Sequence, residues 1–441
     1  MNHKPLVPRS LLLPFVLITA LFALWGFAND ITNPMVAAFK RVLELNNFQA
    51  SLVQMAFYGG YFTMALPAAF FVKKYSYKSG VMLGLCLYAF GALLFYPAAA
   101  WENFAFFLAA LYILTFGLAF LETTANPYIL SMGPPETATR RLNLAQAFNP
   151  MGALAGLFVA KEFILNRLQS NNLDDQGNLI FEQLDEGAKA VIRTGDLMVI
   201  RNPYVGLGLV VIIMLVLIAV VKMPENQNKG ASLDIKKSFD RLWGNKHFVE
   251  GVFAQMFYVG AQIMCWTYIY QYAEVLGIDN ATAVNFGYTA LVLFLAGRWI
   301  CTYFLRFWSP GFLLMVFSLM AILMSLGTIF IQGMGGLYCL VGISFFMSLM
   351  FPTIYGIALE GLGDDAKFGA AFLVMAIVGG AIMPTLQGMI LDIGGTAYDD
   401  VRILGVPEVN FSFVLPLVCF IFVALFSYRV LFIHQRGNYE N

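Results

Sequence analysis

Residues 12–38 read LLPFVLITALFALWGFANDITNPMVAA, and Asn29 and Asp30 are the first strongly polar side chains in this run. A helix that crosses the hydrocarbon core of a bilayer needs roughly 20 mostly apolar residues, which this stretch supplies. Lys4 and Arg9 precede it, as basic residues precede the core of a secretory signal peptide. The apolar run is too long for such a peptide, and many similar runs follow. The stretch therefore predicts the first span of a polytopic membrane protein.

The whole chain has the composition of a membrane protein. Of its 441 residues, 60% are hydrophobic and only 12% are charged, whereas soluble domains average about 25% charged residues. Scanning for long apolar runs gives about twelve helical spans. The expected spans are 12–38, 48–73, 79–99, 103–132, 143–166, 200–222, 247–276, 281–307, 309–332, 335–362, 366–394 and 408–434. The predicted fold class is an all-α membrane protein.

The segment 223–246 is the sizeable polar stretch near the middle of the chain, and we interpret it as a cytoplasmic linker. It divides the chain into a six-helix half over 1–222 and a second over 247–441. Most Lys and Arg residues then fall on the side that carries both termini, so the positive-inside rule predicts cytoplasmic termini. The long loop 167–199 counts little in this balance. Many secondary transporters consist of two such repeated halves, with the substrate site in a central cavity at their interface.

Several functions are disfavoured by what the sequence lacks. Lys plus Arg and Asp plus Glu both number 26, so charge gives no indication of a nucleic-acid partner. The five cysteines form no CxxC pair, and we expect neither a disulfide framework nor a metal site. The chain has no HExxH, nucleophile elbow or GxxxxGK[ST] motif, which argues against an enzyme and against direct use of ATP. We expect no cofactor.

Two carboxyl groups fall well inside predicted spans. Asp30 lies in the first span and Glu122 lies in the fourth. A carboxylate at mid-bilayer costs about 2.5–3.5 kcal/mol, so it is first treated as functional. Burial disfavours the charged form, which suits a group that gains a proton on one side of the membrane and loses it on the other. The alternative is that each carboxyl is a structural hydrogen-bond partner.

Neutral polar side chains gather on single faces of several spans, because helical residues three or four apart are neighbours. Asn and Gln amides match sugar hydroxyls, and aromatic rings can cover the apolar face of a sugar. Transmembrane amides also join helices, and this structural alternative stays open for any single amide. The candidate sugar-binding residues are Trp25, Asn29, Asn33, Asn126, Asn143, Gln146, Asn149, Gln255, Tyr258, Gln262 and Trp266.

Three basic residues are candidates for gating or structural roles. Arg298 lies inside the eighth span, where snorkelling or pairing with a carboxylate is expected. Lys73 and Lys74 follow the second span and are interpreted mainly as topology anchors. A direct role of Arg298 in binding substrate is the less favoured alternative.

Several uncommon stretches carry a resemblance to a known family. They are FALWGFAND, NNFQASLVQMAFYGGYF, KKYSYKSG, LETTANPY, RRLNLAQAFNPMGA, FYVGAQIMCWTYI and FPTIYG, and together they extend over nearly the whole chain. The sequence resembles the fucose permease branch of the major facilitator superfamily, the fucose–galactose–glucose:proton symporters. This resemblance implies a major facilitator fold in a bacterial cytoplasmic membrane, with sugar and proton moving inward together. It also implies that Glu122 is a coupling carboxylate and that Trp25, Gln146 and Asn149 contact sugar.

The chain departs from the family pattern at two places. The family carries its first-span carboxylate at the position of Asn33, whereas this sequence has Asp30, one helical turn earlier. A family tyrosine before the Pro-Thr of the tenth span is Phe351 here, which removes one hydroxyl group from a position that we assign to substrate binding.

The predicted function is proton-coupled import of L-fucose by a monomer in the lipid bilayer, with the sugar and the proton as its small-molecule partners. Open alternatives within this class are a symporter for galactose, glucose or N-acetylglucosamine, and one driven by sodium. From other classes, a membrane sugar sensor, an efflux pump and an intramembrane enzyme were considered.

Overall fold

The computed structural model describes residues 6–32, 35–45, 47–172, 174, 180–224, 235–278, 280–391 and 402–434. Within these ranges, twelve helical segments are long and apolar enough to cross a membrane, which confirms the predicted number of spans. The chain divides by packing into two compact units. We call the unit with Arg9–Tyr128 and Phe148–Ala231 the N-unit. The unit with Met1–Pro8, Ile129–Ala147 and Ser232–Asn441 is the C-unit.

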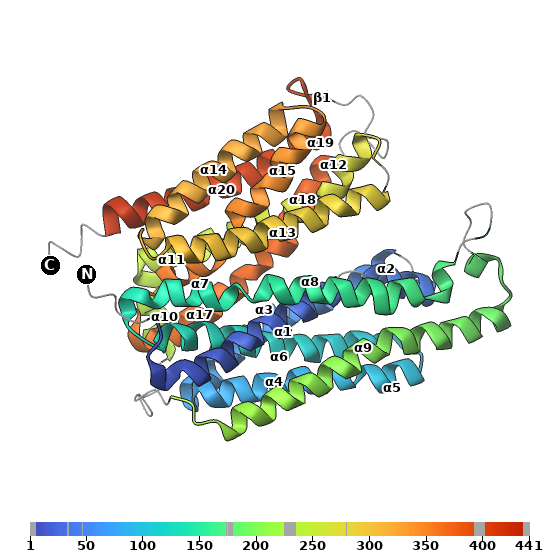
Figure 1. Ribbon diagram of the computed structural model, residues 1–441, viewed down its shortest axis with the longest axis horizontal. Coiled ribbons are helices and arrows are strands. Elements are labelled where there is room, and N and C mark those ends of the chain that lie inside the picture. Colours follow the sequence, from blue (N-terminus) through green and yellow to red (C-terminus); the bar gives the residue numbers. More distant parts are fainter. Residues whose placement is uncertain are drawn as a thin grey trace. The chain divides into compact units, whose positions relative to one another are not determined.

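The N-unit consists of long helices that run side by side (Figure 1). Apolar side chains cover most of each helix, as expected for segments that face lipid on one side and other helices on the other. The most extensive pairing joins α1 to α8, and α4 packs along α9. Its helices are α1 (Leu12–Thr32), α2 (Met35–Val42), α3 (Asn47–Lys74), α4 (Tyr77–Leu93), α5 (Phe95–Ala100), most of α6 (Phe104–Ser131), α8 (Asn149–Val159) and α9 (Glu186–Val220).

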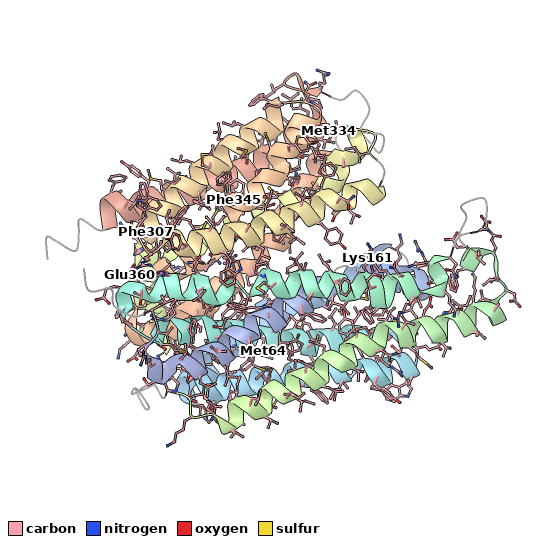
Figure 2. The ribbon with its side chains drawn as sticks, in the orientation of Figure 1. Met64, Lys161, Phe307, Met334, Phe345 and Glu360 are labelled. Carbon is pink, nitrogen blue, oxygen red and sulfur yellow. The ribbon has the colours of Figure 1, made fainter. Side chains whose placement is uncertain are left out.

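The C-unit is built in the same way, with α11 packed against α20, α18 and α16. Its core is rich in aromatic contacts; Phe345, labelled in Figure 2, stacks on Phe317 with ring centroids 6.0 Å apart. A two-residue hairpin pairs β1 (Arg402–Ile403) with β2 (Val406–Pro407). Its helices are α7 (Ala138–Gln146), α10 (Ile235–Gly244), α11 (Lys246–Thr267), α12 (Ile269–Val275), α13 (Asn280–Phe304), α14 (Pro310–Phe330), α15 (Met334–Met347), α16 (Met350–Ala358), α17 (Ala366–Met375), α18 (Gly379–Leu391), α19 (Glu408–Ser412) and α20 (Val414–Arg429).

The packing units do not follow the sequence boundaries that we predicted for the two halves. Ile129–Ala147 comes from the first half of the sequence but groups with the C-unit, because α7 packs against α13 and α16. The division into 1–222, a linker over 223–246, and 247–441 stays a prediction. Residues 225–234 of that linker lie outside the described residues.

Several of the spans are broken helices rather than continuous ones, including those in which α7 is followed by α8, α15 by α16, and α17 by α18. Proline explains two of these breaks, because it has no N–H to donate to the carbonyl four residues earlier. Pro150 therefore leaves the carbonyl of Gln146 without its helical donor, and Pro352 does the same to Ser348. Each break frees backbone groups for other partners.

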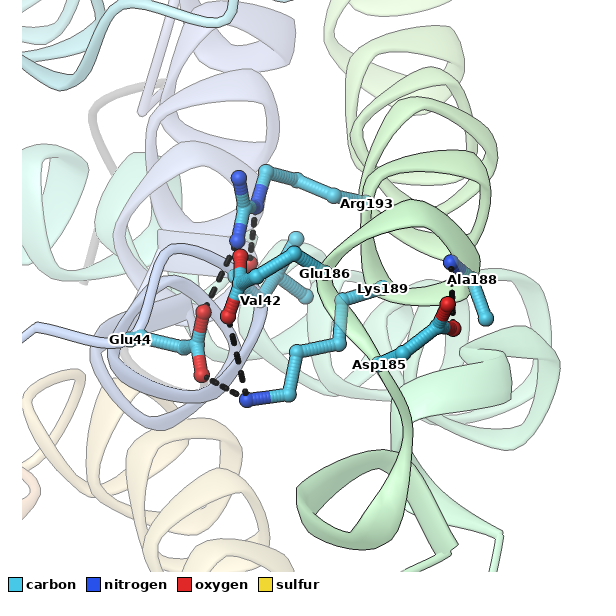
Figure 3. A network of polar contacts seen from close by, with 7 residues as sticks. All are labelled: Val42, Glu44, Asp185, Glu186, Ala188, Lys189 and Arg193. Atoms are coloured by element: carbon cyan, nitrogen blue, oxygen red, sulfur yellow. Dashed lines mark hydrogen bonds and ion pairs between the residues drawn. The ribbon is translucent and has the colours of Figure 1, made fainter.

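The sixth span differs from its prediction. We expected a loop over 167–199 and a span over 200–222, but α9 already begins at Glu186. Asp185 caps its first turn by accepting a hydrogen bond from the Ala188 N–H. The charged first turns are held by ion pairs with a residue after α2, shown in Figure 3. Charge pairing therefore extends this helix beyond its apolar part.

These ion pairs centre on Glu44. Lys189 Nζ lies 2.7 Å from Glu44 Oε1 and Arg193 Nη2 lies 2.8 Å from Glu44 Oε2. Arg193 Nε also donates to the carbonyl of Val42, at the end of α2. The hydrogen bond from Lys189 lowers the pKa of the Glu44 carboxyl below its ordinary value of 4.5. The network ties the end of α2 to α9 within the N-unit.

Candidate functional site

The predicted N-unit residues gather around Trp25. Its indole Nε1–H donates to the hydroxyl of Tyr61 over 2.7 Å, and that hydroxyl donates to Asn29 Oδ1 over 3.4 Å. The Trp25 ring stacks on Phe22, with ring centroids 5.5 Å apart. The structure thus brings Trp25 and Asn29 together through a tyrosine of α3 that the sequence analysis did not select. The available signal was that Tyr61 lies within NNFQASLVQMAFYGGYF, one of the stretches that carry the family resemblance.

Asn149 belongs to the same neighbourhood because α1 and α8 approach at backbone contact. A Cβ atom on Gly152 would lie 1.8 Å from the carbonyl oxygen of Ala23, and one on Gly26 would lie 2.0 Å from that of Asn149. Only glycine at both positions permits this distance. The Asn149 side chain then donates from Nδ2 to the carbonyl of Phe22 over 3.3 Å.

The two predicted carboxyl groups differ in their surroundings. Glu122 in α6 is buried, with 4% of its surface exposed, and it forms no ion pair within the described residues. It lies close enough to Tyr61 to act on it electrostatically. Asp30 in α1 is half-buried and acts in the same way on Tyr58 of α3. Tyr58 and Tyr61 are three residues apart and therefore share a face of α3.

The other predicted residues of the N-unit are Asn126, Asn33, Lys73 and Lys74. Asn126 is fully buried, and its Nδ2 donates to the backbone carbonyl of Glu122, so part of its amide serves the helix itself. Asn33 lies outside the described residues. Lys73 and Lys74 end α3, and the Lys74 ammonium lies 5.4 Å from the centre of the Tyr75 ring.

In the C-unit, the main polar contact joins Gln146 to Arg298. Arg298 Nη1 lies 3.3 Å from Gln146 Oε1 and 3.3 Å from the Gln146 carbonyl oxygen. That carbonyl is the one that Pro150 deprives of a helical donor. Arg298 is 3% exposed, and it makes no ion pair within the described part of the chain. The expected pairing with a carboxylate is therefore replaced by pairing with a neutral amide.

Aromatic rings hold this arginine in place. The guanidinium carbon lies 4.9 Å from the centre of the Phe294 ring, which suits a cation–π contact. Phe294 meets the edge of Trp266 at 5.1 Å. Trp266 in turn donates from Nε1 to the hydroxyl of Ser344 over 3.2 Å. Arg298 and Trp266 thus belong to one packed group.

The remaining C-unit candidates serve the broken helices in part. Asn143 Nδ2 donates to Thr353 Oγ1 of α16 over 3.2 Å, while its Oδ1 has no partner within the described residues. The Tyr258 hydroxyl donates to the carbonyl of Met347 at the end of α15, and its ring meets Phe351 edge to face at 6.3 Å. A structural role is therefore visible for Tyr258.

Two glutamines of α11 differ in burial. Gln255 is fully buried, and neither atom of its amide has a hydrogen-bond partner within the described residues. A buried unpaired amide is costly, so it needs a partner that the described residues do not supply. Gln262 is half-buried. Within the same ranges, no three His, Cys, Asp or Glu side chains come together to hold a metal ion.

Arg141 is a residue to which the sequence analysis gave no role. It is fully buried, and its guanidinium donates to the carbonyls of Ile129, Leu130 and Leu6. The first two belong to the last turn of α6, where carbonyls lack helical donors and a cation is favoured. Its position in RRLNLAQ gave no signal of this burial.

The comparisons with known proteins agree with this architecture. The model of the Major Facilitator Superfamily matches residues 16–384. The L-fucose-proton symporter of Haemophilus influenzae is 56% identical over 97% of this chain and 99% of its own length. That of Escherichia coli is 35% identical over 95% of this chain and 93% of its own. A crystal structure of the superfamily transporter FucP in the outward conformation superposes with a TM-score of 0.85, at 33% identity, over 95% of this chain and 99% of that chain.

The predicted fold class and family are thereby confirmed. The match extends over both units and includes every stretch on which the resemblance was based. The chain is an integral, multi-pass membrane protein and belongs to the Major Facilitator Superfamily, in the branch that includes these L-fucose-proton symporters.

Proposed function

We propose that this protein is a secondary active transporter that imports L-fucose together with protons by alternating access. The observation that carries the proposal is Glu122, a buried carboxyl group with no ion pair among the described residues, near Tyr61 in a cluster of aromatic and amide groups. The names of the two L-fucose-proton symporters, one of them 56% identical, support the same function. We further propose a monomer in the bacterial cytoplasmic membrane, with both termini cytoplasmic.

The proposed sugar-binding groups are all neutral and include both aromatic rings and amides. In the N-unit, Trp25 offers an aromatic ring and Asn29 and Asn149 offer amides; in the C-unit, Gln146 and Gln255 offer amides. A sugar has hydroxyl groups that both donate and accept, so amides match it in either direction. A charged substrate would instead need an opposite charge at the contact. These sets favour a neutral, hydroxylated solute over a lipophilic cation.

Proton coupling is assigned to Glu122, with Asp30 as a second group. A buried carboxyl without a cation is more stable when it is protonated. Exposure to water on one side permits release of the proton. Symport follows when the protonated form favours sugar binding or the return of the loaded carrier. No cofactor is part of this scheme.

A second candidate is a symporter for galactose, glucose or N-acetylglucosamine. The observation in its favour is Phe351, which packs on Tyr258 and lacks the hydroxyl of the family's tyrosine. Loss of one hydroxyl near a sugar changes which epimer is preferred, because a substrate hydroxyl is left without its partner. The same residues would carry out transport of either sugar.

The test is uptake of radiolabelled sugar into proteoliposomes under an imposed pH gradient, with fucose, galactose, glucose and N-acetylglucosamine compared. We expect gradient-stimulated uptake of fucose, and its collapse when a protonophore is added. If a sodium gradient alone stimulates sugar uptake, the coupling ion is sodium rather than the proton. Binding of sugar without uptake of any of the four would contradict transport and favour a sensor.

A further inference from the structure

The amphipathic helix α10 (Ile235–Gly244, IKKSFDRLWG) precedes the first span of the C-unit and has no part in the proposed site. One of its faces is fastened to the protein. Ser238 and Leu242 are buried. On the neighbouring flank, Arg241 Nε lies 2.7 Å from Asp365 Oδ2 and its Nη2 lies 2.8 Å from Asp365 Oδ1. This two-point ion pair joins α10 to the turn before α17, so α10 has a fixed orientation.

The opposite face of α10 presents aromatic rings. Phe239 is 44% exposed and Trp243 is 50% exposed. The two rings stack with centroids 5.6 Å apart, and both lie within about 6 Å of the Phe372 ring on α17. Phe372 belongs to the membrane span Gly363–Leu391. The exposed rings therefore pack on the first half of this span, and Trp is enriched near the ends of spans in membrane proteins.

One basic side chain lies on the stripe of this aromatic pair, and two more lie elsewhere on α10 or next to it. Lys236 is exposed and lies on the same helical stripe, since positions 236, 239 and 243 are spaced by three and four residues. Lys237 and Lys246 are exposed as well. Asp240 is the acidic residue of α10. Because Asp365 is neutralised by Arg241, the exposed charge of the helix is positive.

We propose that α10 lies in the headgroup layer of the membrane and binds acidic phospholipids. Phe239 and Trp243 insert at the level of the upper acyl chains, and Lys236 and Lys237 contact the anionic headgroups. Each lysine near such a surface strengthens binding by about fivefold. The occupant is a lipid rather than a soluble protein, because the rings pack on Phe372, a partly exposed residue of a helix that is long and apolar enough to cross the membrane. This inference does not depend on which sugar is carried.

The experiment measures quenching of Trp243 fluorescence by brominated lipids in nanodiscs that hold the full-length protein. Nanodiscs have the same lipids in both leaflets, so the orientation of the protein does not affect the result. The contribution of Trp243 is the difference between the protein and Trp243→Phe, which keeps the aromatic stack. Brominated phosphatidylglycerol and brominated phosphatidylcholine are compared at equal mole fraction.

We expect Trp243 to be quenched by both lipids, and about twofold more by the acidic lipid. In Lys236→Gln/Lys237→Gln, quenching by phosphatidylcholine should persist, while the preference for phosphatidylglycerol disappears. Lys161→Gln, a change at an exposed lysine near the end of α8 (Figure 2), is the matched control and should keep the preference.

Two results would overturn the proposal. Equal quenching by the two lipids in the unmodified protein would show that the lysines select no acidic headgroup. Quenching of Trp243 by aqueous acrylamide but by neither lipid would place the aromatic pair in water, where it would suit a soluble protein partner instead. Thermal unfolding checks that the Lys236→Gln/Lys237→Gln variant is folded, and a folded variant that keeps the preference for phosphatidylglycerol would also contradict the proposal.

Discussion

Each unit holds a tryptophan that donates a hydrogen bond to a hydroxyl group, but the charged side chains near the two tryptophans have opposite sign. In the N-unit, Trp25 donates to Tyr61, near the acidic groups Glu122 and Asp30. In the C-unit, Trp266 donates to Ser344 and packs against Phe294, which supports a guanidinium group. A carboxyl group can release and regain a proton, whereas an arginine does not. This difference supports our proposal that the N-unit handles the proton and that the C-unit holds an amide in a fixed position.

The largest expected effect is loss of coupling in Glu122→Gln. The amide has nearly the shape of the protonated acid but cannot release a proton. Sugar accumulation under a pH gradient should therefore fall to the equilibrium level, while counterflow of sugar across the membrane persists. Both are measured in proteoliposomes with labelled fucose.

Asp30→Asn sharpens the same comparison within the N-unit. Asp30 is half-buried, so replacing its carboxyl group by an amide should reduce the accumulation of sugar without abolishing it. Full accumulation by Glu122→Gln would transfer the coupling role to another group. Full accumulation by Asp30→Asn would make Asp30 structural.

The next effect is on folding and concerns one glycine from each unit. In the N-unit, a Cβ on Gly152 would meet the backbone of Ala23 at 1.8 Å, whereas in the C-unit one on Gly380 would meet the Ile263 side chain at 3.0 Å. Backbone cannot move aside as a side chain can. Gly152→Ala should lower the free energy of unfolding by about 1–3 kcal/mol or more, the range typical of overpacking. Gly380→Ala should lower it clearly less. Thermal unfolding in detergent measures both.

A control for the glycine pair is available in α9. A Cβ on Gly206 would meet nothing within 4 Å, so Gly206→Ala should be neutral or stabilise the helix by up to about 1 kcal/mol. Equal unfolding temperatures for Gly152→Ala and Gly206→Ala would mean that α1 and α8 are not in backbone contact.

Arg298→Ala tests the positioning role assigned to the C-unit. The change leaves both oxygens of Gln146 without this donor, and a hydrogen bond to a charged group contributes about 1.5–3 kcal/mol. We expect sugar Kd to rise by about tenfold, which corresponds to 1.4 kcal/mol, with coupling retained in what transport remains. Arg298→Lys keeps the charge but not the guanidinium shape, so its sugar Kd should lie between those of the unmodified protein and Arg298→Ala. Loss of coupling with unchanged Kd would contradict the assignment.

The sequence predicts the number of spans and the burial of Glu122 well, because both depend on the cost of polar groups in lipid. Helical spacing also placed polar residues on common faces within one helix. Helical spacing could not identify partners on different helices, such as Tyr61 as the partner of Trp25 or Gln146 as the partner of Arg298. The early start of α9 was missed because its first turns are charged and are held by Glu44, which is remote in sequence. Arg141 was missed because backbone carbonyls, which every residue has, surround it.

The smallest expected effect concerns the Glu44 ion pairs of the N-unit. Because Lys189 lowers the pKa of Glu44 in the folded protein, the pairs stabilise the fold above pH 4.5 and this contribution is lost as the pH falls through the lowered value. Glu44 is 40% exposed, so solvent screens the effect and salt weakens it. Glu44→Gln should unfold at a slightly lower temperature at pH 7, with the difference from the unmodified protein vanishing at low pH and at high salt. A difference that grows as the pH falls would mean that Glu44 is stabilised in its protonated form, and that α9 keeps its charged first turns for another reason.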